Sequence, residues 1–262
     1  MSNAYQKYTG NKELRDSIKS KEVAPQENKI IKNVPKLYKK EEGLLDPSLF
    51  IIVSGGEVRE RDYFSFFKNK IYSFPRIVIK FIAKDSDGIG GLDVDKLVKV
   101  ALQIKAEKEV SKSEDIIDII KIVTDVDHFY LRIVANIPVC IDNNIEMIIS
   151  NPCFEIWLYY SYYSTIPDFV TPSDKLKISS QFKTYLGKKH KGGVDPRKAP
   201  FKIASAIENS SNNFSLDENG IPKLFSTQMH TLASKLYNLT KEDIERERKK
   251  LEQKRKLHLK NK

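Results

Sequence analysis

The chain has 262 residues, 40% of them hydrophobic, and a formal net charge of +10. This length allows one large domain, or one domain with an appended subdomain and tails. No apolar run approaches the roughly 18 to 20 residues that a membrane span requires, and the first residues are too polar for a secretory signal. We therefore predict a cytoplasmic protein without a membrane partner.

The positive charge is unevenly distributed. Residues 241–262 hold ten Lys/Arg against five Asp/Glu, and residues 1–47 hold ten against seven. Between them, residues 183–202 hold seven basic residues against one acid. Because basic segments attract polyanions, nucleic acid is the acidic partner that we expect.

The two cysteines predict no cysteine chemistry. Cys140 and Cys153 have no second pair and no nearby histidine cluster. A disulfide framework and a thiolate zinc site are therefore not expected, and both residues are interpreted as small buried side chains.

The first clear element follows a polar arm. Residues 1–46 lack sustained periodicity and predict a poorly ordered basic arm. Residues 49–53 read as a buried strand that stops at 54–56, where two glycines permit a tight turn. A helix follows, with apolar residues at helical spacing: Tyr63, Phe64, Phe67 and Ile71. The order is therefore strand, glycine turn, helix.

A second strand and helix continue the alternation. Residues 76–83 predict a strand, and residues 84–91 form a loop whose Asp85 and Asp87 we interpret as solvated turn residues. This loop lacks the glycine and the final acid of a calcium-binding EF-hand. Residues 97–104 then predict the next helix.

The run 116–128 is a β-branched strand that ends in two acids, Asp125 and Asp127. Ligands of open α/β sheets bind just beyond the carboxyl ends of the strands, and paired carboxylates suit a hard cation such as Mg²⁺ or Mn²⁺. The pair is therefore a candidate metal site. The alternative is that one Asp caps the following helix and the other is solvated.

After these acids, residues 129–134 predict a helix that closes before Pro138, and residues 146–150 predict a fourth strand. Asn151-Pro152 indicates a helix start, followed by an aromatic helix over 154–163. Strands alternating with helices predict an α/β fold with a parallel sheet. The ends of three strands would then meet along one edge.

From residue 166 the pattern changes to helices with long polar connections, over 175–186, 201–207 and 226–239. Thr240 with Asp243 can cap a separate charged helix or tail over 241–262. Between the first two helices lies a glycine-flanked basic segment, which either binds phosphates or is a solvated loop. Its candidate substrate-binding residues are Lys188, Lys189, Lys191, Arg197 and Lys198.

Three segments together resemble the RloB family, whose fold is similar to the Toprim fold. Residues 54–64 resemble its Glu-Gly-x-x-Thr-Glu-x-x-Tyr-Phe pattern, residues 124–128 its Asp-x-Asp, and residues 150–158 its Ser-Asn-Pro-x-Phe-Glu-x-Trp-Leu. Residues 226–230 resemble a Ser-Thr-x-x-His segment. The resemblance implies a Toprim-like core over 47–165, with a parallel sheet flanked by helices, and a helical subdomain over 166–240.

The same resemblance implies a metal-dependent nuclease in bacterial anti-phage defence, with a possible restriction or defence-system partner. Asp125 would be a direct metal ligand, and Asp127 would bind a second metal or orient water. Glu57 is the provisional third ligand and general base. Substrate, DNA or RNA, and oligomeric state stay open.

One departure from the family pattern affects the chemistry. Its first Glu falls on Gly55, while Glu60 matches its second Glu and Glu57 is an extra acid. A displaced carboxylate can disturb catalysis, since catalytic groups tolerate about 1 Å of misplacement poorly. The alternative is therefore a catalytically attenuated module that binds nucleic acid or a defence partner. Supporting roles are expected for Gly55, Gly56, Glu60, Asn151 and Glu155.

Overall fold

A computed structural model describes residues 50–56, 58–71, 77–81, 93–109 and 119–260. All of them belong to one compact unit, Leu45–Lys262. The predicted N-terminal arm, the loop with Asp85 and Asp87, and the candidate ligand Glu57 lie outside the described residues. In the described part, no helix is both long and apolar enough to cross a membrane.

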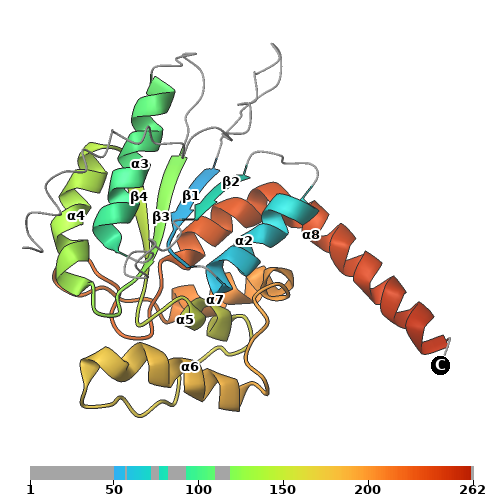
Figure 1. Cartoon of the computed structure of the whole chain (residues 1–262). Coiled ribbons are helices and arrows are strands. Elements are labelled where there is room, and N and C mark those ends of the chain that lie inside the picture. Colours follow the sequence, from blue (N-terminus) through green and yellow to red (C-terminus); the bar gives the residue numbers. More distant parts are fainter. Residues whose placement is uncertain (1–49, 57, 72–76, 82–92, 110–118, 261–262) are drawn as a thin grey trace, which may run out of the picture. The chain divides into compact units, whose positions relative to one another are not determined.

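The predicted parallel sheet is confirmed (Figure 1). Four parallel strands lie in the order β2-β1-β3-β4. Their bounds are β1 Phe50–Ser54, β2 Ile77–Phe81, β3 Ile119–Asp125 and β4 Ile145–Ser150. The β-branched runs therefore form the sheet, as their composition predicts.

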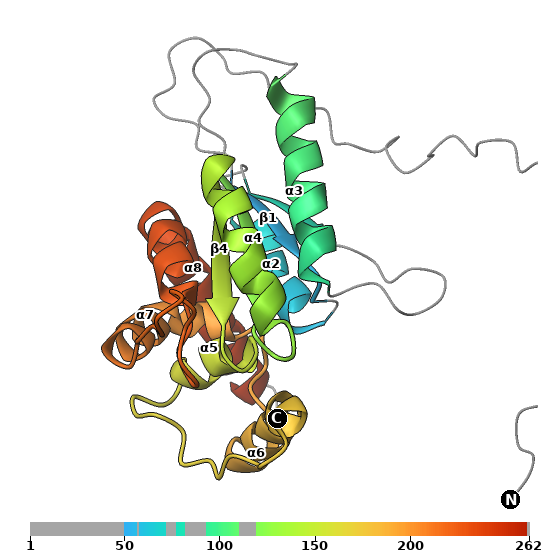
Figure 2. The same ribbon diagram turned by 90° about the vertical axis from the view of Figure 1, so that its left-hand side faces the viewer.

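Helices cover both faces of this sheet (Figures 1 and 2). Those on one face are α3 Val94–Glu109 and α4 Tyr130–Asp142. The core cluster on the other side is built from α2 Arg59–Lys70, α5 Glu155–Tyr160, α6 Ile178–Lys189, α7 Ile203–Asn212 and α8 Met229–Lys260, with short 3-10 helices at Lys175–Lys177 and Ala199–Lys202. Of these, α2 and α8 lie against the sheet, whereas α6 lies beyond the carboxyl ends of the strands. Side chains of a strand alternate between faces, so Ile51 packs with the α3 side and Ile52 with the aromatic cluster of α2 and α5.

The prediction that a helix closes before Pro138 is wrong, because α4 continues to Asp142. A proline inside a helix removes one hydrogen bond and costs about 3 kcal/mol. However, α4 buries Ile133 before the proline and Cys140 after it, both in the core on that face of the sheet. Burial on both sides of Pro138 outweighs the lost bond.

The prediction of a separate C-terminal helix beginning near Thr240 is also wrong, because α8 runs unbroken through this position. The Thr240 hydroxyl donates to the Leu236 carbonyl at 2.6 Å. Asp243 accepts from Arg246 at 2.6 Å. Both side chains are bonded within the helix and cap no helix start, so the boundary predicted at residue 240 divides a single element.

Candidate functional site

The carboxyl ends of the strands form the edge at which the acids lie. Asp125 is the last residue of β3, and its register partner is Ser150, the last residue of β4. Ser54, the last residue of β1, pairs with Val123. The glycine turn after β1 and the acid of β3 are therefore neighbours at the edge where α/β sheets bind ligands.

Glu60 brings a carboxylate to the turn after β1. It lies in the first turn of α2, and its carboxyl group rests against Gly56 so closely that a Cβ there would overlap it. The Gly56 N–H donates to the Ser54 hydroxyl at 3.1 Å, which holds the turn. Gly55 is buried and, as a glycine, has no side-chain carboxylate. Glu60, which matches the second Glu of the family pattern, therefore places a carboxylate beside the glycine turn, while Gly55 has none.

Glu155 adds a second acid between two cations. It begins α5 and is 7% exposed. Its carboxylate lies 4.0 Å from Arg59 Nε of α2 and 3.9 Å from Lys183 Nζ of α6. Arg59 also donates to the Val194 carbonyl at 3.1 Å. Side chains of three helices therefore meet at this carboxylate, and a loop carbonyl holds one of them, Arg59.

The acids Asp125, Glu60 and Glu155, which we call the acid cluster, influence one another strongly. Burial and then the charges of Glu60 and Glu155 raise the pKa of Asp125 well above its usual range. Burial also raises the pKa of Glu60 to about 7, and the charge of Glu155 adds to this. Like charges in a desolvated site cannot all ionise without compensation. The cluster therefore favours any ligand that brings positive charge.

Lys183 supplies part of that charge. Burial acts to lower its pKa, but the negative charges of Glu155, Asp125 and Glu60 outweigh burial and raise it. Its ammonium group is therefore held in the charged form beside the acids. Neither Lys183 nor Arg59 was singled out from the sequence, because only the folded chain shows which cations meet the strand ends.

A divalent cation could bind at the acid cluster with only one or two protein side chains as ligands. The Asp125 Oδ1 atom is buried and has no hydrogen-bond partner among the described residues. Within that part of the chain, no three His, Cys, Asp or Glu side chains form a group able to hold a metal. Mg²⁺ commonly takes only one or two carboxylates and completes its coordination with waters and substrate phosphates. Asp125 and Glu60 suit such a site.

Asp127 lies at the margin of this site. Its backbone has φ 31°, in the left-handed region, and its N–H donates to the Pro152 carbonyl at 3.2 Å. Its carboxylate is 3.4 Å from His128 Nδ1. Phe129 is the N-cap of α4 and makes no side-chain cap bond, so neither Asp caps that helix. The capping alternative for the Asp125/Asp127 pair is therefore wrong.

Asn151 has a different role from the predicted helix cap. α5 begins only at Glu155 and has six residues, too few for an N-terminal phosphate site. The Asn151 amide donates to the Pro222 carbonyl at 2.7 Å, and its backbone exchanges bonds with Phe225 and Ser226. Asn151 therefore fastens the end of β4 to the segment before α8.

The predicted phosphate-binding residues lie in and after the last turn of α6, because this helix extends to Lys189. Arg197 Nε and Lys198 Nζ lie 3.0 Å and 3.6 Å from Asp195. Lys189 lies over the Tyr163 and Tyr185 rings. Lys188 and Lys191 are exposed. Three of the five cations therefore already contact neighbouring side chains.

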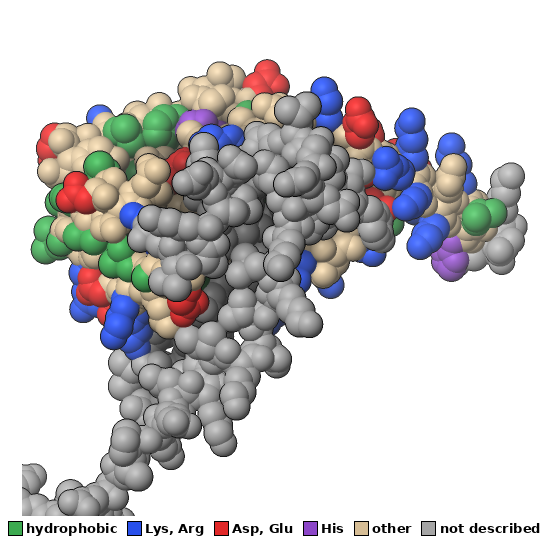
Figure 3. Space-filling view, turned by 90° about the horizontal axis from the view of Figure 1, so that it is seen from above, with side chains coloured by type: hydrophobic (Ala, Val, Ile, Leu, Met, Phe, Trp, Pro, Cys, Tyr) green, Lys and Arg blue, Asp and Glu red, His purple; other side chains and the backbone are tan. Residues whose placement is uncertain are grey.

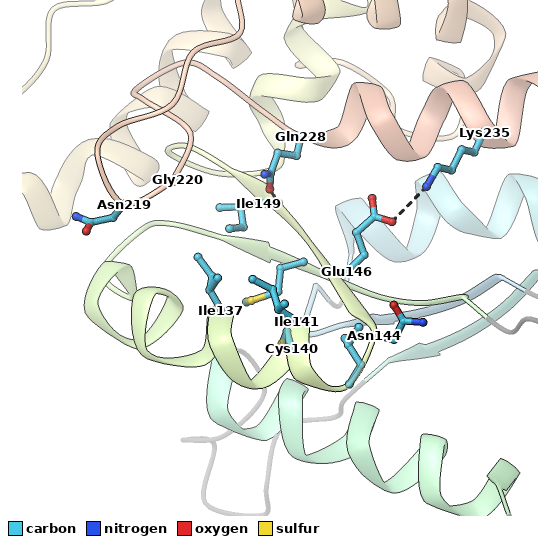
Figure 4. A pocket seen from close by; sticks show the side chains of 12 residues that line it. Ile137, Cys140, Ile141, Asn144, Glu146, Ile149, Asn219, Gly220, Gln228 and Lys235 are labelled. Carbon is cyan, nitrogen blue, oxygen red and sulfur yellow. Dashed lines mark hydrogen bonds and ion pairs between the residues drawn. The ribbon is translucent and has the colours of Figure 1, made fainter.

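A separate pocket of about 620 Å³ lies between β4, α4 and the start of α8 (Figure 4). Glu146 points across it toward Lys235, at 3.3 Å. Glu146 also pairs with Lys121, a fully buried lysine of β3. This arrangement neutralises a buried charge, and none of the acid cluster lines the pocket.

Comparison with known families gives one finding. A family model described as RloB-like protein matches residues 50–236, which include the sheet, the acid cluster and the start of α8. No curated protein and no solved structure matches the chain. The match confirms the resemblance drawn from the three sequence segments.

Proposed function

The chain belongs to the RloB-like protein family, and on this premise we propose that it is a divalent-cation-dependent nuclease acting at the carboxyl edge of its sheet. The observation that carries the proposal is the Asp125 carboxylate, whose Oδ1 atom is buried and has no hydrogen-bond partner among the described residues. An uncompensated buried carboxylate is costly unless a cation or proton joins it. A bound Mg²⁺ or Mn²⁺ would remove that cost.

Asp125 and Glu60 are the residues that we assign to the cation. Asp125 ends β3, and Glu60 lies at the start of α2, the helix that follows the neighbouring strand β1. When bound, the metal would lower the pKa of a coordinated water and polarise the phosphate. Glu57, outside the described residues, remains a candidate general base. Asp127 is assigned to orienting water or a second cation.

Arg59 and Lys183 are assigned to the substrate phosphate. Both lie about 4 Å from Glu155, close enough to exchange a carboxylate for a phosphate oxygen by small side-chain movements. A guanidinium can bind two phosphate oxygens at once, whereas an ammonium acts as a point charge. Glu155 then holds both cations in place before substrate arrives.

The attenuated module remains the second candidate. It is favoured by the buried Gly55, which carries no acid, and by the lack of a three-ligand group in the described part of the chain. Such a module would bind nucleic acid or a defence partner without turnover. The family resemblance supports bacterial anti-phage defence as the setting for either function.

Cleavage assays separate the two candidates. The substrates are single-stranded and duplex DNA, single-stranded and duplex RNA, and transfer RNA. Each is incubated with Mg²⁺ or Mn²⁺ and, in a parallel reaction, with EDTA. We expect metal-dependent cleavage by the wild type, loss of at least about 100-fold in rate for Asp125→Asn, and wild-type rates for Asp142→Asn. Asp142 is an exposed acid at the opposite end of the sheet, so it makes a matched control. Binding without cleavage on every substrate would instead support the attenuated module.

A further inference from the structure

The end of α8 leaves the folded body as a single exposed helix. Near the start of this exposed part, the Arg248 guanidinium donates to the Phe201 carbonyl. Beyond it, residues 249–259 are all exposed. Figures 1 and 3 show this part of α8 projecting away from the other elements. We call residues 249–260 the arm, which is distinct from the N-terminal arm predicted for residues 1–46.

The arm is strongly basic. It contains six Lys/Arg and one acid, Glu252. Figure 3 shows Lys and Arg side chains gathered along it. Cations stabilise a helix C-terminus through the helix dipole, but this effect is confined to the last turn. Lys249, Lys250 and Lys254 lie more than one turn from Lys260, so the dipole does not account for them.

The exposed leucines of the arm do not form a docking seam for another helix. Leu251, Leu257 and Leu259 are 40%, 61% and 74% exposed. Side chains share a helix face when they are three or four residues apart, whereas these three are six and two apart. At about 100° per residue, Leu257 points roughly 120° away from Leu251 and 160° away from Leu259, while Leu251 and Leu259 are two turns and roughly 80° apart. A coiled coil needs a continuous apolar stripe, and the arm has none.

We propose that the arm binds the phosphate backbone of nucleic acid and thereby holds a strand for the site at the sheet edge. Duplex DNA carries one charge per about 1.7 Å, and a twelve-residue helix is about 18 Å long. The arm can therefore contact several phosphates in succession. This inference rests on the proposed function for its biological purpose, although binding itself requires no cleavage.

The position of the arm is compatible with this role. In Figures 1 and 2, which share a vertical axis, the end of α8 lies at the height of α6. The carboxyl ends of the strands point toward that same end of the molecule. By contrast, Arg197 and Lys198 of the α6 segment are paired with Asp195. In the arm, Lys250 lies 2.7 Å from Glu247, and the exposed Lys249, Lys254 and Lys256 are the cations on which the proposal rests.

Salt-dependent binding of a labelled 20-base-pair DNA and a labelled single-stranded RNA, measured in EDTA, tests the arm. The arm variant combines Lys249→Gln, Lys254→Gln and Lys256→Gln. The matched variant combines Lys188→Gln, Lys189→Gln and Lys191→Gln, with the same change of charge. We expect the arm variant to lower the slope of log affinity against log salt by about 2 to 3 units, since each phosphate contact contributes about 0.7 to 0.9. The matched variant should change it by less than about 1 unit.

Three results would overturn the proposal: unchanged affinity and slope in the arm variant, a larger loss in the matched variant, or a changed oligomeric state of the arm variant in light scattering. Circular dichroism confirms that each variant is folded. Asp125→Asn separates this inference from the proposed function. If Asp125→Asn and the wild type bind with equal slopes but neither cleaves, the nuclease proposal fails while the arm stands. If the wild type cleaves and the arm variant binds as tightly, the arm fails alone.

Discussion

At the scale of single residues, the position of Glu60 bears on the absence of an acid at Gly55, where the family pattern has Glu. Sequence alignment leaves Gly55 where an acid is expected, yet the Glu60 carboxyl lies against Gly56 beside the end of β1. Alignment compares positions along the chain, whereas a helix returns a side chain toward the turn that precedes it. Glu60, the match to the second Glu of the pattern, therefore brings a carboxylate to the glycine turn without replacing the acid absent at Gly55.

Replacing Glu60 by Gln should stabilise the metal-free protein at neutral pH. The pKa of Glu60 is raised from 4.5 to about 7. Between these values the folded state binds the proton more tightly than the unfolded state, so the free energy of unfolding falls as pH rises. Glu60→Gln avoids this loss, and we expect a gain on the order of 2 kcal/mol at pH 7.5. At pH 4 the variant and the wild type should be about equally stable.

Urea unfolding at both pH values, with EDTA present, measures this difference. The Glu60→Gln variant should also lose nuclease activity, since it lacks a proposed metal ligand. A variant that is less stable than the wild type at pH 7.5 would show that the Glu60 carboxylate is not strained by burial and by Glu155.

Gly56→Ala should disturb the contact between Gly56 and the Glu60 carboxyl group by changing Gly56 instead of Glu60. The added methyl would overlap the end of the Glu60 side chain, which can move to another rotamer, so we expect a loss of only about 0.5 to 1 kcal/mol. Gly187 in α6 is the matched control, because nothing lies within 4 Å of a Cβ placed there. We expect Gly187→Ala to stabilise the helix by about 0.5 to 1 kcal/mol. Thermal unfolding of both variants gives the comparison, and equal melting temperatures would contradict it.

At the scale of elements, α4 shows where local rules yield to packing. The proline rule predicts a helix end, but burial of Ile133 and Cys140 keeps the helix continuous across Pro138. Similarly, α8 continues through Thr240 because its side chain bonds back to Leu236. In both cases, contacts made by neighbouring turns determine the element, and these are not visible in a window of sequence.

Pro138→Ala should therefore stabilise α4. Pro138 is exposed, so Ala removes no core contact and restores an N–H that can bond one turn back. Proline is about 3 kcal/mol less favourable than Ala inside a helix, and part of this is offset because proline also restricts the unfolded chain. We expect a net gain of about 1 to 2 kcal/mol in chemical denaturation. Val139→Ala, at the next position, should change stability by only a few tenths.

At the scale of the whole molecule, the sequence predicts the architecture better than the site. The β-branched runs and aromatic periodicities identify all four strands of the described sheet and the helices between them. They also place Asp125 at a strand end. The contributions of Arg59 and Lys183 escape prediction, because they depend on how α2 and α6 pack around Glu155. Charge counts identify basic segments, but only the fold shows that Arg197 and Lys198 are paired while the arm is exposed.

The central claim is that the acid cluster binds a divalent cation through Asp125. Titration calorimetry of Mg²⁺ and Mn²⁺ into the metal-free protein at pH 7.5, in two buffers of different ionisation enthalpy, tests it without any assumption about substrate. The raised pKa values of Asp125 and Glu60 predict that binding displaces protons, as metal binding to carboxylates requires their ionised form. Wild type and Asp142→Asn should both bind the cation with proton release, and Asp125→Asn should show no such event. Equal binding by Asp125→Asn, or no binding by the wild type, would contradict the account.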